Sequence, residues 1–208
     1  MDRLKLYIGD KHLSSWSMRP WLLMKHFEIP FEENLIHLDQ ADSKDKIAGV
    51  SPSSLVPVLV DKDLKIWDSL AICEYLVEKF PKINLWPESL KQRALARSVC
   101  AEMHSGFSAL RKECPMNLTT IEKEKKQLSI EAQKNISRID ALWSQCREAS
   151  KAQGDFLFGE FCIADAFFMP VVSRIRTYNL VLNLEHSKKY YSHVMATPLF
   201  KMWLEVAQ

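Results

Sequence analysis

The chain has 208 residues, 47% of them hydrophobic, which is enough for one sizeable hydrophobic core or two modest ones. Its 28 Lys and Arg residues nearly balance its 26 Asp and Glu residues, which argues against nucleic acid or an anionic membrane surface as a partner. Five scattered cysteines with no C-x-x-C pair favour neither a disulfide scaffold nor a zinc site, and they fit a reducing cytosol.

The start of the chain and its hydropathy predict neither export nor membrane insertion. The segment Met1–Lys5 is charged and is not followed by the long apolar core of a signal peptide. No apolar run reaches the length that a bilayer requires. We therefore expect a cytoplasmic protein without a membrane-spanning segment.

The first eighty residues predict a small α/β unit. The expected elements are a strand at 4–8, a helix at 21–27, a strand at 31–38, a loop or irregular helix at 39–49, strands at 56–60 and 64–67, and a helix at 69–80. Because a helix connects the first two strands, these should be parallel. The last two strands form a hairpin.

The stretch Ser14-Ser15-Trp16-Ser17-Met18-Arg19 lies between the first strand and the first helix. The start of a helix offers unpaired backbone N–H groups and the positive end of the helix dipole, so it can hold an anion. Pro20 favours Ser17 as the N-cap, because proline is harmless only in the first turn. An earlier start, with Pro20 inside the helix, is the alternative. Either start puts Ser14 at the positive end of the helix dipole, although serines at that position usually act only as N-caps.

Two more short motifs in the first half of the chain each precede a predicted strand or helix. Val56-Pro57 precedes the third strand, which fits an edge strand or a cis bond in a tight turn. A cis proline would leave the backbone of Val56 free to pair with an extended ligand. Asp68-Ser69 precedes the last helix of this half, and a helix cap is the simplest interpretation of the pair.

Beyond a linker near residues 84–88, the chain is predicted to be helical. A buried stripe on one helix is expected from the spacing of Val99, Met103, Gly106 and Leu110. His104 and Arg111 are seven residues apart and therefore nearly aligned on another face of that helix. Thr119-x-x-Glu122 matches a capping box that would open a long helix. The apolar stripe of that helix consists of Leu128, Ala132, Ile136, Ile139, Trp143 and Cys146.

Taken in order, the serine cluster, Val56-Pro57 and Asp68-Ser69 resemble the glutathione-binding domain of the soluble glutathione S-transferases. The segment Ala71-Ile72-Cys73-Glu74-Tyr75-Leu76 resembles the family's helix after the serine, and Phe161–Ala166 resembles its capping motif for a buried helix. Ser-Ser-x-Ser-x-Arg is most similar to the zeta class, and Ala101–Phe107 with Arg111 resembles a bacterial zeta-like subgroup. The resemblance covers nearly the whole chain.

The resemblance implies a fold and a domain organisation. The fold would be a thioredoxin-like α/β N-terminal domain followed by an all-α C-terminal domain. The implied domains are residues 1–80, which would bind glutathione, a linker at 81–89, and a helical domain at 90–208. A homodimer is implied as well, because that is usual in the family.

The resemblance also implies the site residues. Glutathione would be bound by Ser14, Ser15, Val56, Pro57, Asp68 and Ser69, with Ser14 favouring the thiolate. Free thiols have a pKa of about 8.5, so a hydroxyl donor and a helix dipole that lower the pKa by about one to two units are sufficient without a general base. The electrophile pocket would contain Trp16, His104 and Arg111. An exposed or partner-paired side chain is the alternative for Arg111, and no metal is expected.

The chain departs from the family pattern at several places. It has Ser51-Pro52 and Ser54 where the family often has Asn-Pro and Gly, Asp68 where the family has Glu, and Cys162 where a Ser or Thr cap is usual. No cysteine stands at the start of the first helix, which argues against thiol transferases of the omega type and against glutaredoxins. Tyr7 lies inside the first strand and is assigned to the core.

The predicted activity is that of a glutathione S-transferase, a detoxifying enzyme that adds the glutathione thiolate to a small hydrophobic electrophile. A glutathione-dependent cis-trans isomerase of the maleylacetoacetate type would use the same thiolate. A non-enzymatic glutathione-binding or scaffold protein is the other alternative, because a fold does not fix a function. Retention of Ser14, Val56-Pro57 and Asp68-Ser69 weighs against this last alternative.

Overall fold

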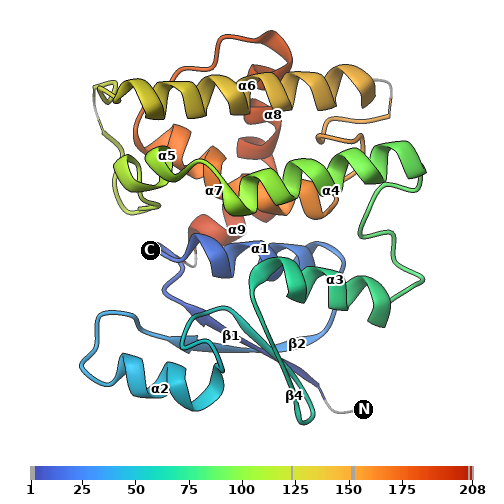
Figure 1. Ribbon diagram of the computed structural model, residues 1–208, viewed down its shortest axis with the longest axis vertical. Helices are drawn as coiled ribbons and strands as arrows, with labels where there is room; N and C mark the ends of the chain where they lie inside the picture. Colours follow the sequence, from blue (N-terminus) through green and yellow to red (C-terminus); the bar gives the residue numbers. More distant parts are fainter. Residues whose placement is uncertain (1–2, 123, 151–152, 206, 208) are drawn as a thin grey trace.

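The computed structural model describes residues 3–122, 124–150, 153–205 and 207. A four-stranded sheet forms one part of the molecule, and a layer of helices stands above it (Figure 1). The strands are β1 (Leu4–Gly9), β2 (Phe31–Ile36), β3 (Val58–Asp61) and β4 (Leu64–Trp67), in the order β2-β1-β3-β4. β1 and β2 are parallel, as predicted, and the other two pairings are antiparallel. This is the predicted thioredoxin-like arrangement.

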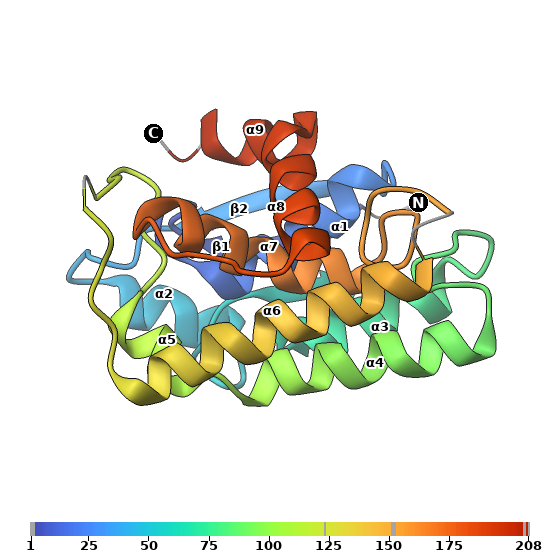
Figure 2. The ribbon, with the colours of Figure 1, turned by 90° about the horizontal axis from the view of Figure 1, so that it is seen from above.

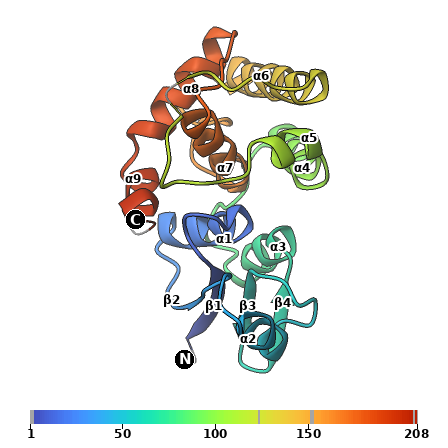
Figure 3. The ribbon, with the colours of Figure 1, turned by 90° about the vertical axis from the view of Figure 1, so that its left-hand side faces the viewer.

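Three helices accompany the sheet: α1 (Ser15–His26), α2 (Ser43–Val50) and α3 (Ser69–Lys79). α1 and α3 lie between the sheet and the upper helices, and α2 lies on the other side (Figure 3). The segment left open as loop or irregular helix therefore contains a short helix. β2 ends before the predicted Leu38, because the N–H of Leu38 donates instead to Asp10 Oδ2 at 2.7 Å. Tyr7 lies in β1 but is only half-buried, so its assignment to the core was wrong.

The remaining helices are α4 (Leu90–Ser105), α5 (Ser108–Glu113), α6 (Ile130–Ser150), α7 (Ile163–Thr177), α8 (Glu185–Ala196) and α9 (Pro198–Glu205). α7 is buried over almost its whole length, among α1, α4 and α8 (Figure 2). α9 returns to α1, where the rings of Trp203 and Trp21 meet edge to face at 4.8 Å. From residue 90 onward the described ranges contain no strand beyond two isolated bridges, so this region is all-helical, as predicted. Its division from residues 1–80 and the linker 81–89 stays a proposal. No helix in the described ranges is long and apolar enough to cross a bilayer.

The start of α1 differs from the first prediction and agrees with its alternative. Ser14, not Ser17, is the N-cap, and Pro20 lies inside the helix. The Ser14 hydroxyl oxygen accepts the N–H of Ser17 at 3.3 Å. Ser17 is instead needed at the end of β1, where its hydroxyl accepts the N–H of Gly9 at 3.1 Å. Because this bond to β1 uses the Ser17 hydroxyl, the helix starts earlier and Pro20 lies beyond its first turn.

The predicted capping box at Thr119 and Glu122 is wrong. Residues 119–122 and 124–129 are not helical, and the N–H of Glu122 donates to the carbonyl of Thr177 at the end of α7, at 2.7 Å. α6 starts later, where Ser129 Oγ accepts the N–H of Ala132 at 3.2 Å. The predicted apolar stripe is buried on α6 except for Leu128, which precedes the helix and is partly buried.

The single helix predicted to carry both His104 and Arg111 is two helices. α4 ends at Ser105 with Gly106 as its C-cap, and Phe107 has a left-handed backbone with φ 60° before α5 begins. Val99, Met103 and Leu110 are buried, as predicted, whereas Gly106 is only partly buried, so its place in the predicted stripe was wrong. The alignment of His104 with Arg111 on one helix face is therefore wrong, and their relation has to be read from the tertiary structure.

Candidate active site

Two adjoining cavities lie where the first turn of α1 meets the helical layer. One has a volume of about 490 Å³, and its polar and aromatic lining includes Ser14, Ser15, Trp16, Arg111 and Arg174. The other has a volume of about 350 Å³ and is lined by Pro57, Asp68 and Ser69, among others. Both are lined by Trp16, Leu55 and Val56, so they form one continuous candidate site.

The three serines of the first turn differ in what they can reach. The Ser14 hydroxyl donates to Ser17 Oγ at 2.7 Å and lines the larger cavity. Ser15 lines the same cavity, and its hydroxyl oxygen accepts from Arg174 Nη2 at 3.3 Å. Ser17 is fully buried and lines neither cavity. A ligand in the cavity can therefore contact Ser14 or Ser15 but not Ser17.

Arg174 is a site residue that the sequence analysis missed. It comes from α7, is only 4% exposed, and donates through Nε to the carbonyl of Cys114 at 2.8 Å. Burial, followed by repulsion from Arg111, lowers the pKa of Arg174 to about 10. The one sequence signal for it is a charged residue two positions after the apolar run 167–172 of α7. A charge at such a place needs an explanation.

Arg19 connects the two helix starts. Its guanidinium is fully buried between the rings of Trp16, at 4.2 Å, and Phe167, at 4.5 Å. Nη1 donates to Ser69 Oγ at 3.1 Å. Burial, then the charges of Arg111 and Arg174, lower the pKa of Arg19 to about 9. The hydroxyl of Ser69 is thus held in place by a buried cation.

Asp68 is the N-cap of α3, in agreement with the simpler interpretation of its sequence position. Oδ1 accepts the N–H of Leu70 at 2.8 Å, and the backbone of Asp68 has a positive φ of 73°. Oδ2 lies 3.0 Å from His104 Nε2. The side chain is 40% exposed, so a ligand can still reach its carboxylate.

His104 and Arg111 take different places. His104 lies behind Trp16, edge to face at 5.2 Å, and lines neither cavity. Burial lowers the pKa of His104, and the charge of Asp68 opposes this. Arg111 lines the larger cavity, with its guanidinium 4.9 Å from the centre of the Trp16 ring and its Nε donating to the carbonyl of Gly106 at 3.0 Å. Burial lowers the pKa of Arg111 too.

The charge of the site is positive. In the described part of the chain, none of Arg19, Arg111 and Arg174 forms an ion pair with a carboxylate. Cations of this kind in a partly water-free region favour an anion beside them. The arrangement can therefore stabilise a thiolate or a carboxylate in the larger cavity.

Val56 lines both cavities. The Val56-Pro57 bond is cis, as one of the two predicted possibilities, whereas the edge-strand possibility is wrong because β3 lies inside the sheet. Neither the N–H nor the carbonyl of Val56 has a hydrogen-bond partner among the described residues. Both groups are available to an extended ligand.

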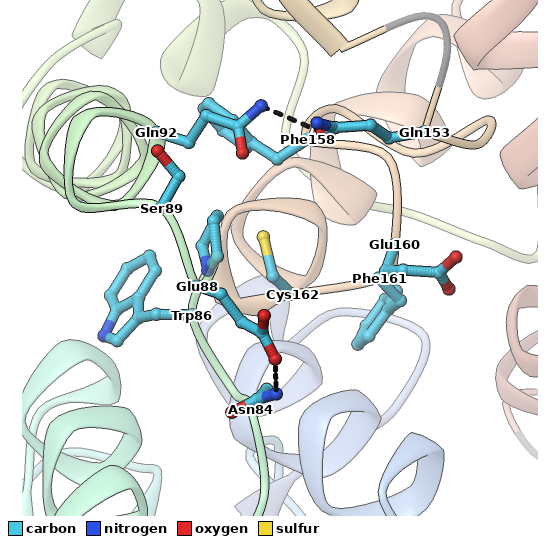
Figure 4. Close-up of a pocket in the computed structure, with 11 residues that line it drawn as sticks. Asn84, Trp86, Glu88, Ser89, Gln92, Gln153, Phe158, Glu160, Phe161 and Cys162 are labelled. Atoms are coloured by element: carbon cyan, nitrogen blue, oxygen red, sulfur yellow. Dashed lines mark hydrogen bonds between the residues drawn. The ribbon is translucent and has the colours of Figure 1, made fainter.

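A third cavity, of about 380 Å³, lies between the linker and the start of α7 (Figure 4). Its polar side chains are largely paired with one another, as in the bond from Gln92 Nε2 to Gln153 Oε1 at 2.9 Å. It contains none of the predicted site residues. The described ranges also hold no group of His, Cys, Asp or Glu side chains placed to bind a metal ion.

Comparisons with known proteins agree with this geometry. Residues 13–79 match the family model described as glutathione S-transferase, N-terminal domain. The chain is 29% identical over 181 residues to glutathione S-transferase Z1 of Arabidopsis thaliana, which covers 82% of this chain and 76% of that protein. It is 32% identical over 105 residues to a probable maleylacetoacetate isomerase of Caenorhabditis elegans, over 50% of this chain and 48% of the relative.

A solved structure supports the fold over the whole length. A glutathione transferase homolog from Burkholderia gl BGR1, solved with bound glutathione, has a TM-score of 0.74 at 22% identity. The match covers 99% of this chain and 98% of the other.

Proposed function

Because the chain belongs to the glutathione S-transferase family, we propose that it is a glutathione transferase, which activates the glutathione thiol and adds it to a small electrophile. The observation that supports this most is the position of Ser14. Its hydroxyl stands at the positive end of α1 and lines a cavity that adjoins the start of α3. The electrophile that we expect is small and hydrophobic, because Leu13, Leu38, Ile47, Pro115 and Met116 line much of the larger cavity.

We propose that glutathione lies across both cavities. Its γ-glutamyl carboxylate would bind at the start of α3, where Ser69 and the dipole favour an anion and Arg19 adds a positive charge behind the hydroxyl. Its ammonium group would meet Asp68, and its cysteinyl backbone would pair with Val56 beside Pro57. The thiol would then face Ser14, with Ser15 next to it.

The chemistry needs only stabilisation of the thiolate. A free thiol has a pKa of about 8.5, so most glutathione is protonated at neutral pH. A hydroxyl donor, the start of α1 and nearby cations all favour the charged form. Each unit by which the pKa falls corresponds to about 1.4 kcal/mol of preferential binding of the thiolate.

The first experiment is capture on immobilised glutathione, elution with free glutathione, and turnover of a chlorinated nitroarene by the eluted protein. Retention and turnover together support a transferase. Retention without turnover of any electrophile favours a binding or scaffold protein. Absence of retention and of turnover contradicts the proposal.

An isomerase of the maleylacetoacetate type is the second candidate, and a specific feature favours it. Arg111 lines the larger cavity without a carboxylate partner in the described part of the chain, so it is placed to hold an anionic group of the second substrate. The C. elegans relative carries the name of such an isomerase. In this reaction the thiolate adds to a double bond and leaves again, so that glutathione is not consumed.

Arg111 variants test the second substrate. Arg111→Ala should raise KM about tenfold for an electrophile that carries a carboxylate and change KM little for an apolar one, because only the first loses a charge-assisted hydrogen bond. Steady-state kinetics with both electrophiles measure this. Lys112→Ala is the matched control, since Lys112 is the neighbouring cation on α5, is exposed and lines neither cavity. Equal effects of Arg111→Ala on both electrophiles, in folded protein, would remove Arg111 from substrate binding.

Asp68 variants test the γ-glutamyl end. Asp68→Asn keeps an acceptor for the cap of α3 and removes the negative charge. We expect about tenfold weaker binding of glutathione, measured by calorimetry, because a charge-assisted contact with its ammonium group is lost. Binding of an analogue without the α-amino group should hardly change. Equal weakening of both ligands would place Asp68 outside the site.

We also propose that the protein is a cytoplasmic homodimer. β4 is an edge strand, and Leu64 on it is 51% exposed. An apolar strand edge of this kind favours contact with another chain. A monomeric mass in solution at micromolar concentration would contradict the dimer.

A further inference from the structure

The hydroxyl of Ser15 is in a different state from that of Ser14. The Ser14 hydrogen is used in the bond to Ser17 Oγ at 2.7 Å. Ser15 Oγ accepts from Arg174 Nη2 at 3.3 Å, and the part of the chain that the structure describes offers no acceptor for its own hydrogen. Since both serines line the larger cavity, Ser15 can donate to a ligand there without giving up an existing bond.

Arg174 holds a positive charge directly behind this hydroxyl. Its other two nitrogens donate to backbone carbonyls, Nε to Cys114 at 2.8 Å and Nη1 to Pro170 at 3.0 Å. These bonds fix the guanidinium plane, so that Nη2 points to Ser15.

The charged and titratable groups that face Arg174 do not neutralise it. They are Arg19 on α1, Arg111 on α5, Cys114 after α5, and Tyr178 at the end of α7. None of them is a carboxylate. A hydroxyl that accepts from a cation becomes a stronger donor itself, and low local polarity increases this effect.

We propose that Ser15 is a second hydrogen-bond donor to the glutathione thiolate and that Arg174 is the positioning residue that holds and polarises it. This rests on the function proposed above, and it adds Arg174, which lies outside the first-turn motif that contains Ser15. When the thiol ionises, its proton leaves to solvent. Ser15 keeps its own proton and donates a hydrogen bond to the sulfur, as Ser14 does once its hydroxyl turns from Ser17.

The test is the pKa of enzyme-bound glutathione, followed as thiolate absorbance in the ultraviolet during a pH titration. Ser15→Ala and Arg174→Gln should each raise this pKa by about one unit, equivalent to an about tenfold loss of thiolate at neutral pH. The double variant should raise it no further, because Arg174 acts through Ser15. Arg174→Lys keeps the charge and should restore part of the effect.

Arg176→Gln is the matched control. Arg176 lies two residues further along α7, is half-buried, and lines neither cavity of the site. It should leave the thiol pKa unchanged. An equal rise in this control would assign the effect to a general loss of positive charge and overturn the proposal.

Other outcomes are equally decisive. A Ser15→Ala protein with an unchanged thiol pKa overturns the proposal, as do fully additive effects of the two substitutions. If Arg174→Gln does not fold, Ser15→Ala and Arg174→Lys still give the result. Absence of a thiolate signal in the wild-type protein would overturn the proposed function as well, whereas a normal wild-type signal that Ser15→Ala leaves unchanged overturns this inference alone.

Discussion

Replacement of Ser14 by alanine is expected to lower kcat/KM for glutathione conjugation about a hundredfold at neutral pH, the usual effect of removing one donor from an anionic reaction centre. Ser14 stands at the N-cap of α1 and lines the larger cavity, so its hydroxyl can turn from Ser17 to the thiolate. Glutathione binding should change little, because the tripeptide's other contacts remain. The pH profile of kcat/KM measures the result and should shift to higher pH.

Ser17→Ala is the control for this experiment. Ser17 does not reach the cavity, but its hydroxyl accepts the N–H of Gly9 at the end of β1. Its loss should therefore lower the free energy of unfolding by about 1 to 2 kcal/mol, with the pH profile nearly unchanged. If Ser17→Ala removes activity and Ser14→Ala does not, the assignment of Ser14 to the thiol is wrong.

Features that depend on nearby residues could be predicted from the sequence. The crossover helix gives parallel β1 and β2, and Asp68 caps α3 as its position suggests. The apolar spacing also gave the buried stripe of α6 from Ala132 to Cys146. In each of these cases the residues that decide the structure lie within a few turns or one short connection of one another.

Features decided by distant partners could not be predicted. Ser17 has the sequence position of a cap, yet Gly9 in β1 uses its hydroxyl. Thr119 and Glu122 have the spacing of a capping box, yet this segment bonds to the end of α7. The break between α4 and α5 rests on the left-handed backbone of Phe107. Such a backbone is usually signalled in a sequence by glycine, which adopts a positive φ freely, and phenylalanine gives no such signal.

The residues of the candidate site fall into the same two groups, those set by local sequence and those set by distant partners. Its motif residues, from Ser14 to Ser69, gather at two adjoining cavities because the thioredoxin-like sheet brings the starts of α1 and α3 together. Arg174 could not be assigned from the sequence, since it is 159 residues from the serine that it contacts. The same is true of His104, whose position behind Trp16 follows from the end of α4 and from no local pattern.

Replacement of Asp165 by alanine is expected to lower the free energy of unfolding by about 3 kcal/mol at neutral pH, because two buried N–H groups lose their acceptor. Asp165 is fully buried at the start of α7, next to a Cys162 cap that is weaker than Ser or Thr. Its Oδ1 accepts the N–H of Leu157 at 3.0 Å and its Oδ2 accepts that of Cys162 at 2.9 Å. Urea unfolding measures the loss.

The pH dependence of that loss provides a sharper test. Burial raises the pKa of Asp165 to about 6, above its ordinary value of 3.8. The folded protein therefore binds a proton more tightly than the unfolded chain between these two values, and the contribution of Asp165 to stability falls as pH rises through this window. The difference in stability between wild type and Asp165→Ala should accordingly be smallest above pH about 6 and grow toward pH about 4. Glu160→Ala removes an exposed carboxylate nearby and should show no such trend. If the difference in stability between wild type and Asp165→Ala is constant from about pH 4 to 8, the assignment of a raised pKa to Asp165 is contradicted.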